Sequence, residues 1–310
     1  IPFTVLVSPY GLTTIVVRGI NSQQQTPATF TVIGNIIQFT PITGTVGTVV
    51  TIAGDGFGVN ELVHIVFGTK GTITTTSVVA AGTFATTFTV NTQIYGEKSV
   101  TVVGMNSQWQ ATNTFTIAAD IILISPSSGT VGTLVTVEGT GYGASEGIEV
   151  YFGTDVNPIS PAPQSTTDGT WTVTFNVTTQ PIGITTIKAQ GAASFGVDYG
   201  TFNISSAIVV TPTAGSVGSS VTVEGTGYKS GEDIKIDFGS HQVAGPNNQF
   251  FPYNNGTFSV TFYVSTQVYS SKVVTAYSQT TTEAKATSTF FIIPDIYFIT
   301  PISGQVSLTS

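Results

Sequence analysis

Residues 126–142 read PSSGTVGTLVTVEGTGY, and two close copies of this stretch occur in the same chain. The copies are PITGTVGTVVTIAGDGF at residues 41–57 and PTAGSVGSSVTVEGTGY at residues 212–228. A fourth copy opens with PISG at residues 301–304. The copies lie roughly 85 residues apart, which exceeds a solenoid repeat and matches a small domain. The stretch therefore predicts an array of similar domains.

Each repeat alternates apolar and polar residues with a period of two. The motif places Val50 and Ile52 on one face of a strand, and a later segment, LVHIVFG, ends in Phe67 and a glycine. A third segment, GTFATTFTV, carries Phe88, and all three segments recur in every complete repeat. Such alternation is typical of half-buried antiparallel strands. About seven strands per repeat, with no helical period, predict an all-β fold of tandem immunoglobulin-like (Ig-like) β-sandwich domains.

Alignment of the repeats sets the expected domain boundaries. Residues 1–19 align with residues 86–104, so the chain begins within a repeat. The expected units are the last strands of a partial Ig-like domain at 1–35, three complete Ig-like domains at 36–119, 120–205 and 206–293, and the first strand of a further one at 294–310. The missing strands either belong to the same longer chain or come from a neighbouring molecule by strand addition.

The junctions between repeats are short. In TFTIAADIILISP, TFNISSAIVVTP and TFFIIPDIYFITP, two to four residues separate the last strand of one repeat from the first strand of the next. Bulky residues stand beside each junction (Ile121, Ile208 and Ile296), and no flexible Gly/Ser linker intervenes. We therefore expect a stiff, rod-like array.

Composition restricts the partners and the location of the chain. Charged residues make up 8% of the sequence, and the formal net charge is −8, which opposes nucleic-acid binding. No stretch of 18 apolar residues lacks polar breaks, so no membrane span is expected in this segment. The chain has no cysteine, and Thr, Ser, Gly, Gln and Asn replace the missing charges. This neutral polar surface indicates an extracellular, cell-surface protein, and low charge favours self-association.

The motifs together resemble the IPT/TIG family of Ig-like domains. The matching pieces are P-x-x-G-x-x-G-x-x-V-T-V/I-x-G-x-G-F/Y, the strand that ends in Phe-Gly, and the later G-T-F/W-x-x-x-F-x-V strand. The resemblance covers the three complete repeats and the partial ones. It implies that the aromatic residue after Gly-x-Gly packs at the end of the sandwich. Family members occur in receptors, adhesins, secreted enzymes and archaeal or bacterial envelope proteins, so the resemblance implies fold more than function.

Catalytic and crosslinking residues are not expected. Of the two histidines, His64 takes an outward position that Glu149 and Lys235 fill in the other repeats, and His241 lies in a variable loop. None of the seven lysines occupies an inward position that the repeats share, which disfavours Lys–Asn isopeptide bonds. The chain is therefore expected not to be an enzyme.

A glutamate recurs six residues before each Phe-Gly pair, at Glu61, Glu146 and Glu232. One interpretation is a turn residue whose carboxylate accepts backbone N–H bonds. The alternative is a carboxylate at the domain junction that helps to bind Ca²⁺, an ion that takes six to eight oxygen ligands. Asp55 and Asp233 lie nearby in single repeats only, so few acidic residues accompany each glutamate. No other cofactor is expected.

Three N-x-S/T sequons begin at Asn176, Asn203 and Asn255. Asn176 and Asn203 alternate with inward apolar residues, and Asn255 stands in an Asn-Asn-Gly turn, so all three are expected to face solvent. Chance occurrence in a Thr-rich chain is one explanation. N-linked glycosylation of an extracellular glycoprotein is the other.

The longest insertion, residues 240–255, carries the aromatic residues Phe250, Phe251 and Tyr253. This loop either contacts a partner or a sugar, or folds over an edge of its own domain or its neighbour. Trp171 aligns with inward phenylalanines and is expected in a core, whereas Trp109 lies in a loop.

The leading functional hypothesis is an extracellular structural protein of an archaeon or bacterium. Its repeat array would build a surface-layer (S-layer) lattice or a cell-surface filament, with strand exchange between subunits as an option. The alternatives are an adhesin or carbohydrate-binding stalk of a secreted or surface protein, and the accessory array of a secreted polysaccharide enzyme.

Overall fold

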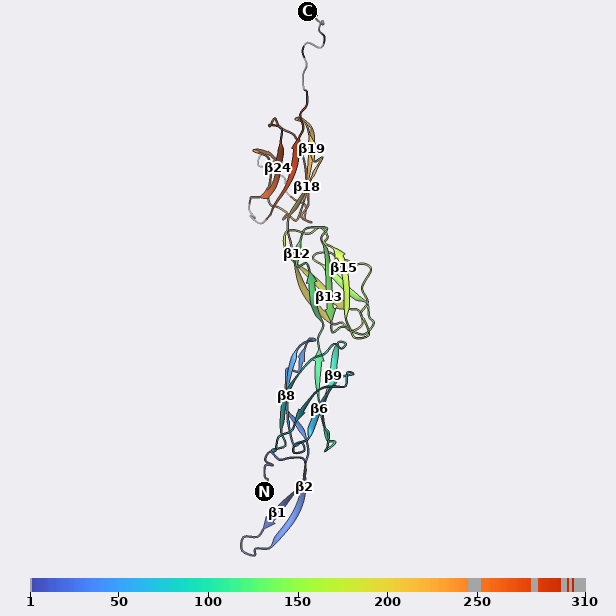
Figure 1. Cartoon of the computed structure of the whole chain (residues 1–310), viewed down its shortest axis with the longest axis vertical. Helices are drawn as coiled ribbons and strands as arrows, with labels where there is room; N and C mark the ends of the chain where they lie inside the picture. Colours follow the sequence, from blue (N-terminus) through green and yellow to red (C-terminus); the bar gives the residue numbers. More distant parts are fainter. Residues whose placement is uncertain (1, 245–251, 280–283, 297–299, 301–302, 304–310) are drawn as a thin grey trace, which may run out of the picture.

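The chain is all β. The computed structural model describes residues 2–244, 252–279, 284–296, 300 and 303, and every regular element within them is a β-strand. The strands form three sandwiches in a row, and a separate hairpin lies at the N-terminal end of the row (Figure 1).

The first complete repeat is a sandwich of two sheets. Its strands are β3 (Asn35–Thr40), β4 (Thr43–Gly44), β5 (Val49–Asp55), β6 (Leu62–Phe67), β7 (Thr72–Ser77), β8 (Phe84–Thr89), β9 (Gly96–Gly104) and β10 (Gln110–Ile117). One sheet has the order β3-β5-β8 and the other the order β4-β10-β9-β6-β7. Neighbouring strands are antiparallel, except that the short strand β4 pairs in parallel with the end of β10.

The second and third repeats have the same plan. The second comprises β11 (Asp120–Ser125), β12 (Ser128–Gly129), β13 (Leu134–Thr140), β14 (Ile148–Phe152), β15 (Trp171–Asn176), β16 (Gly183–Gly191) and β17 (Val197–Ile204). The third comprises β18 (Ala207–Thr211), β19 (Ala214–Gly215), β20 (Ser220–Thr226), β21 (Ile234–Phe238), β22 (His241–Ala244), β23 (Phe258–Tyr263), β24 (Ser271–Ser278) and β25 (Lys285–Ile292). Their sheets are β11-β13-β15 with β12-β17-β16-β14, and β18-β20-β23 with β19-β25-β24-β21-β22.

In every complete repeat the first strand is divided between the two sheets at the proline that opens the motif. β3 lies in the three-stranded sheet, and β4, which follows Pro41, lies in the other. A three-stranded sheet that faces a larger antiparallel sheet, with the first strand shared, is the arrangement of an Ig-like sandwich. The fold class predicted from the alternation is confirmed.

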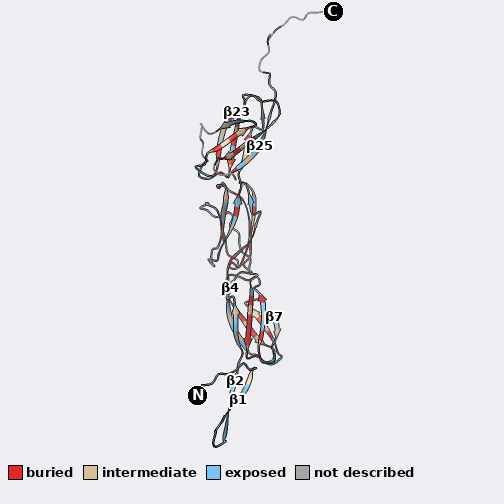
Figure 2. Ribbon diagram, turned by 90° about the vertical axis from the view of Figure 1, so that its left-hand side faces the viewer, coloured by how far each residue is buried: buried red, intermediate tan, exposed pale blue. Residues whose placement is uncertain are grey.

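Aromatic side chains form the same cluster at the centre of each sandwich. The Phe67 ring lies 5.5 Å from Phe88 and 5.9 Å from Phe115, measured between centroids. The equivalent sets are Phe152, Phe175 and Phe202, and Phe238, Phe262 and Phe290. The residues of this cluster are buried. Red, buried segments alternate with exposed ones along the strands of the sandwiches (Figure 2). The Phe-Gly strand and the later Phe strand thus face each other across the core, which confirms the inward positions predicted from the alternation.

A second aromatic pair closes one end of each sandwich. In each repeat the aromatic residue that follows Gly-x-Gly packs against the aromatic residue of the Gly-Thr-Phe/Trp motif. The pairs and their centroid distances are Phe57 and Phe84 at 5.3 Å, Tyr142 and Trp171 at 5.6 Å, and Tyr228 and Phe258 at 4.9 Å. Trp171 is a core residue, as expected, and the aromatic residue after Gly-x-Gly packs where the family resemblance implies.

The hairpin at the N-terminal end matches the last two strands of a complete repeat. Strands β1 (Gly11–Arg18) and β2 (Gln25–Val32) pair in the register of β9 and β10. The described residues 2–8 form no strand, although their alternation predicts one. The reason lies in the sheet order, because the equivalent strand β8 pairs only with β5, and the described residues before β1 contain no such strand.

Only two residues separate consecutive repeats. They are residues 33–34 between β2 and β3, 118–119 between β10 and β11, and 205–206 between β17 and β18. The expected first strand of a further domain at 294–310 lies mostly outside the described residues.

Candidate interaction sites at the domain ends

The carboxylate of Glu61 joins two loops at one end of the first complete repeat. Its Oε2 accepts the backbone N–H groups of Asn106 and Ser107 at 3.0 and 2.9 Å, and its Oε1 accepts the Ser107 hydroxyl at 2.9 Å. The backbone N–H of Gly58 also donates to Oε1. The Glu61 side chain is 1% exposed, so the turn at residues 104–109 and the loop before β6 bury it between them. We call this turn, and residues 191–196 in the second repeat, the receiving turns.

Glu146 makes the same contacts in the second repeat. It accepts the N–H groups of Ala193 and Ser194 at 2.8 and 2.7 Å, and the Ser194 hydroxyl at 2.6 Å. Burial alone would raise the pKa of both glutamates, but the Ser, Ala, Asn and Gly donors outweigh burial and hold the pKa of each below its ordinary value. Glu232 is half-buried at the equivalent position, and part of the turn opposite it lies outside the described residues.

These glutamates do not stand in acidic clusters. No group of three or more His, Cys, Asp or Glu side chains that could hold a metal ion occurs in the described part of the chain. The contacts of Glu61 and Glu146 are hydrogen-bond donors, which satisfy carboxylate oxygens without a cation.

A loop from each repeat rests on the next repeat. The backbone N–H of Tyr10 donates to the carbonyl of Phe57 at 3.0 Å, and that of Tyr95 donates to the carbonyl of Tyr142 at 3.0 Å. These loops read SPYG at residues 8–11 and QIYG at residues 93–96, and the third, QPIG, covers residues 180–183. The same backbone contact therefore forms at two successive junctions, against the aromatic residue that follows Gly-x-Gly.

A glycine on the receiving side makes this approach feasible. A Cβ atom on Gly82 would lie 2.6 Å from Pro9 Cα, and one on Gly256 would lie 2.9 Å from Pro181 Cα. A Cβ atom on Gly169 would lie 3.1 Å from Ile94 Cα. All three have φ near +78°, so the backbone conformation also favours glycine. The glycine of the Gly-Thr-Phe/Trp motif is therefore a junction residue.

A buried glutamine anchors the junction loop to its own repeat. The Gln93 amide donates to the carbonyl of Phe67 at 3.2 Å, and its oxygen accepts the N–H of Thr69 at 3.0 Å. Gln267 likewise donates to the carbonyl of Phe238 at 3.1 Å. The Phe-Gly motif thus supplies both a core ring and the turn that holds the junction loop.

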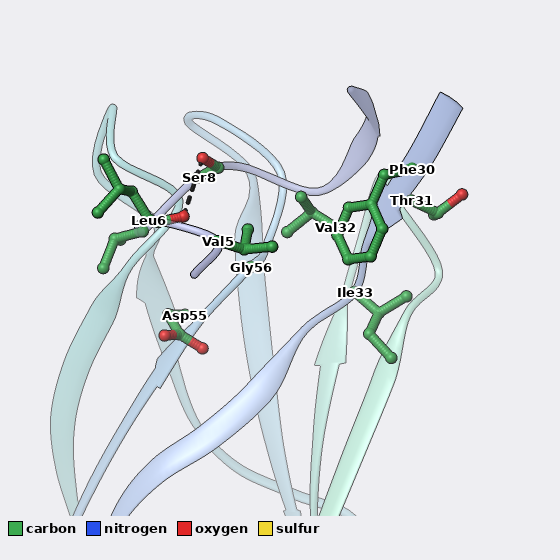
Figure 3. Close-up of a pocket in the computed structure, with 10 residues that line it drawn as sticks. Val5, Leu6, Ser8, Phe30, Thr31, Val32, Ile33, Asp55 and Gly56 are labelled. Carbon is green, nitrogen blue, oxygen red and sulfur yellow. Dashed lines mark hydrogen bonds between the residues drawn. The ribbon is translucent and has the colours of Figure 1, made fainter. Parts of the chain in front are cut away.

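The hairpin exposes side chains whose equivalents are buried in the first complete repeat. Val17 and Phe30 are 67% and 40% exposed, whereas the equivalent Val102 and Phe115 are 0% exposed. A recess of about 220 Å³ opens between the segment with Val5 and Leu6 on one side and the end of β2 on the other (Figure 3). Asp55 and Gly56 of the first complete repeat also line the recess, which therefore lies at the junction between the hairpin and that repeat.

The remaining residues that the sequence singled out are dispersed. Asn176, Asn203 and Asn255 are exposed, and Asn255 Oδ1 accepts the Thr257 hydroxyl at 2.8 Å. Tyr253 is exposed, while Phe250 and Phe251 lie outside the described residues. The half-buried His64 lies on β6 and the exposed His241 begins β22, far apart in the sequence and in different repeats.

Trp109 joins the hairpin to the first complete repeat. Its Nε1–H donates to the carbonyl of Gly34 at 2.8 Å, and its ring lies 6.1 Å from that of Tyr10. It lies in a loop, as the sequence predicts, and these contacts give it a role at the junction. Two further groups of interacting residues were missed, the serines of the receiving turns and the junction glycines. A repeated Gly-x-x-Ser, at residues 104–107 and 191–194, was the available signal for the serines.

No known family profile matches the sequence, and no curated protein matches it. Among solved structures, the chain is similar to the N-terminal eight Ig domains of Down Syndrome Cell Adhesion Molecule, at 15% identity and a TM-score of 0.24, over 93% of this chain and 44% of that one. It is also similar to the D1–D4 ectodomain fragment of ICAM-5, at 12% identity and a TM-score of 0.29, over 92% and 84%. A third is invasin, a bacterial integrin-binding protein, at 13% identity and a TM-score of 0.29, over 91% and 79%.

The chain spans less than half the length of the first of these structures. At these TM-scores the likenesses carry no functional inference, and the fold assignment rests on the strand order. Within the described residues, no helix has the length and apolar character to cross a membrane.

Proposed function

We propose that this chain is part of an extracellular structural protein whose Ig-like repeats form a stiff rod. The rods would build a surface-layer lattice or a cell-surface filament on an archaeal or bacterial cell. The IPT/TIG-like motifs and the neutral polar composition support a location outside the cell.

The observation that carries this proposal is the repeated junction. A backbone hydrogen bond from a short loop to the carbonyl after Gly-x-Gly recurs at successive junctions, with two residues between repeats. Glycines without side chains let the backbones approach closely on the receiving side. An array that needed flexible domains would instead carry Gly/Ser linkers.

Strand exchange between subunits is part of the proposal. The edge of β2 at Thr31 and Val32 is the equivalent of Thr116 and Ile117, which pair in parallel with Thr43 and Gly44. Residues 301–304 repeat the motif that contains such a strand. A neighbouring molecule could supply this strand by β-strand addition.

We further propose that the array needs no calcium, because the Glu61 and Glu146 carboxylates accept hydrogen bonds from N–H and O–H donors. We also propose that it performs no catalysis, because His64 and His241 lie in different repeats. Glycans at Asn176, Asn203 and Asn255, all exposed, would add a hydrophilic coat. An intact mass equal to the sequence mass in native material would remove glycosylation from the proposal.

Electron microscopy of the native cell surface, with antibodies against this chain, tests the main function. We expect labelled sheets or fibres. Label on dispersed monomers only, or none at the surface, would contradict an assembly role.

An adhesin or carbohydrate-binding stalk is the second candidate, supported by the exposed Tyr253 in the insertion of the third repeat. Binding to a glycan array that Phe250→Ala, Phe251→Ala and Tyr253→Ala abolish together would favour this candidate over the structural one.

A further inference from the structure

The turn between β1 and β2 has the geometry of the receiving turns. The N–H of Gly19 donates to the carbonyl of Gln24 at 2.9 Å, and the same bond joins Gly104 to Trp109 and Gly191 to Gly196 at 2.9 Å. The fifth residue of each turn has a positive φ, at 55° for Gln23, 58° for Gln108 and 58° for Phe195.

Side chains in the turn agree as well. The serine hydroxyl lies equally close to the first glycine in all three turns. An ideal Cβ on the glycine would be 2.4 Å from the hydroxyl oxygen in each of the pairs Gly19 and Ser22, Gly104 and Ser107, and Gly191 and Ser194. The Gln23 amide donates to the carbonyl of Ile20 at 2.7 Å, as the Gln108 amide does to Met105 at 2.6 Å. The hairpin therefore holds the shape of a receiving turn without a second sheet to impose it.

In the complete repeats this shape binds a carboxylate through two backbone N–H groups and one hydroxyl. The equivalent donors in the hairpin are the N–H groups of Asn21 and Ser22 and the Ser22 hydroxyl. Both residues are exposed, and no acidic side chain meets these donors within the residues the structure describes. Arg18, the sole charged residue of segment 1–32, lies beside the turn and donates to the Gln23 side chain. Its positive charge also favours an anionic occupant.

The apolar surface below the turn points to the same occupant. In the first complete repeat, the glutamate bound by the receiving turn directly precedes β6, which pairs with β9 in the same sheet and places Val63, Ile65 and Phe67 beside Val102 and Phe115 in one core cluster. The facing sheet completes this cluster with Val50, Ile52 and Phe88. The hairpin presents the equivalent Val17 and Phe30 uncovered, and Phe30 also lines the recess of Figure 3 at the junction with the first complete repeat. A segment that carries a carboxylate, an alternating apolar strand to pair with β1, and a facing strand like β5 would satisfy both features at once.

We propose that the hairpin at residues 11–32 is a docking site for the first half of another Ig-like repeat, and that its turn binds the glutamate carboxylate of that segment. The occupant is a polypeptide built like residues 36–85, with Gly-x-x-Glu before an apolar strand. A complete repeat cannot serve, because its glutamate is already bound. The inference goes beyond the proposed function, since it holds whether or not the rods assemble.

A segmental extension of the chain tests this site. A copy of residues 36–85 placed directly before Ile1 continues in register, because Phe3 aligns with Phe88. We expect amide hydrogen exchange at Asn21 and Ser22 to slow by about tenfold or more in the extended chain. A copy in which its own Glu61 is changed to Gln should lose most of this protection.

Matched serine variants separate the site from general folding. Ser22→Ala should leave the unextended chain unchanged in thermal unfolding and should lower the melting temperature of the added repeat in the extended chain. Ser107→Ala serves as the benchmark in the first complete repeat.

Two results would overturn the proposal. One is equal protection of Asn21 and Ser22 with Glu or Gln in the added copy, which would mean that the turn does not bind the carboxylate. The other is an added copy that leaves the hairpin unprotected, which would mean that a different occupant covers the face. Neither result depends on whether the native material forms sheets or fibres.

Discussion

At the scale of single residues, the sequence located the recurrent glutamates but left their role open. Glu61 and its partner Ser107 are 46 positions apart, so spacing alone could not show that the carboxylate accepts hydrogen bonds from a turn. The inward residues Val63, Ile65 and Phe67 were predictable, because apolar residues at every second position predict which face of a strand is buried. Contacts between loops have no comparable pattern.

Glu61→Gln and Glu146→Gln should each lower the free energy of unfolding of their own repeat by about 1–3 kcal/mol, because the amide nitrogen cannot accept the N–H groups that face it. Equilibrium denaturation of each variant measures this. Glu97→Gln, an exposed change in the first repeat, is the control and should stay within about 0.5 kcal/mol. A loss no larger than that of the control would contradict a structural role.

The same two carboxylates should make stability depend on pH below neutrality. The N–H and O–H donors overcome the effect of burial and lower the pKa of both groups in the folded state. The folded state therefore binds fewer protons than the unfolded state between the two pKa values, so this stabilisation is fully present above the ordinary glutamate pKa of about 4.3. It should be lost as the pH falls through the lower folded-state pKa. Melting temperatures between pH 7 and pH 2 should show a drop that the double Gln variant lacks.

At the scale of elements, the alternation predicted a strand in residues 2–8 that the structure does not contain. A strand forms only when a neighbour takes up its N–H and C=O groups, and the one neighbour of the equivalent β8 is β5. The junction glycines were missed for a related reason. Gly82 faces Pro9, which belongs to the preceding repeat, so an alignment within repeats could not reveal the contact.

Gly82→Ala should undock the hairpin from the first complete repeat, because a Cβ there would lie 2.6 Å from Pro9 Cα. Gly71→Ala is the matched control, since Gly71 has nearly the same φ, 75° against 78°, and nothing within 4 Å of an ideal Cβ. Both changes carry the cost of a left-handed backbone, about 1 kcal/mol. Only Gly82→Ala should also move Tyr10 away from Trp109.

Tryptophan fluorescence reports this movement. In a Trp171→Phe background, which places the residue found at the equivalent position in the other repeats, Trp109 is the remaining tryptophan. Gly82→Ala should shift its emission to the red as Tyr10 leaves, and Gly71→Ala should not. Identical spectra for both variants would place the hairpin contact elsewhere.

At the scale of the whole molecule, the number and order of the repeats follow from the motif, and the row of sandwiches in Figure 1 follows from junctions of two residues. Within the described residues a single ion pair joins neighbouring repeats, from Lys70 Nζ to Asp168 Oδ1 at 2.9 Å. Both side chains are well exposed, so the pair contributes little and is weakened by salt. The close backbone contacts at the junction glycines involve no charged side chains, so salt should not weaken them.

Lys70→Ala should therefore leave the length of the rod unchanged. Small-angle X-ray scattering should give the same maximum dimension for this variant and for the unaltered chain, at low salt and at about 1 M salt, where the screening length is about 3 Å. Gly169→Ala should shorten or broaden the distance distribution, because a Cβ there would lie 2.2 Å from the Tyr142 carbonyl oxygen that accepts the junction bond from Tyr95. A rod that collapses with salt or with Lys70→Ala, but not with Gly169→Ala, would mean that charge rather than backbone contact holds the repeats in line.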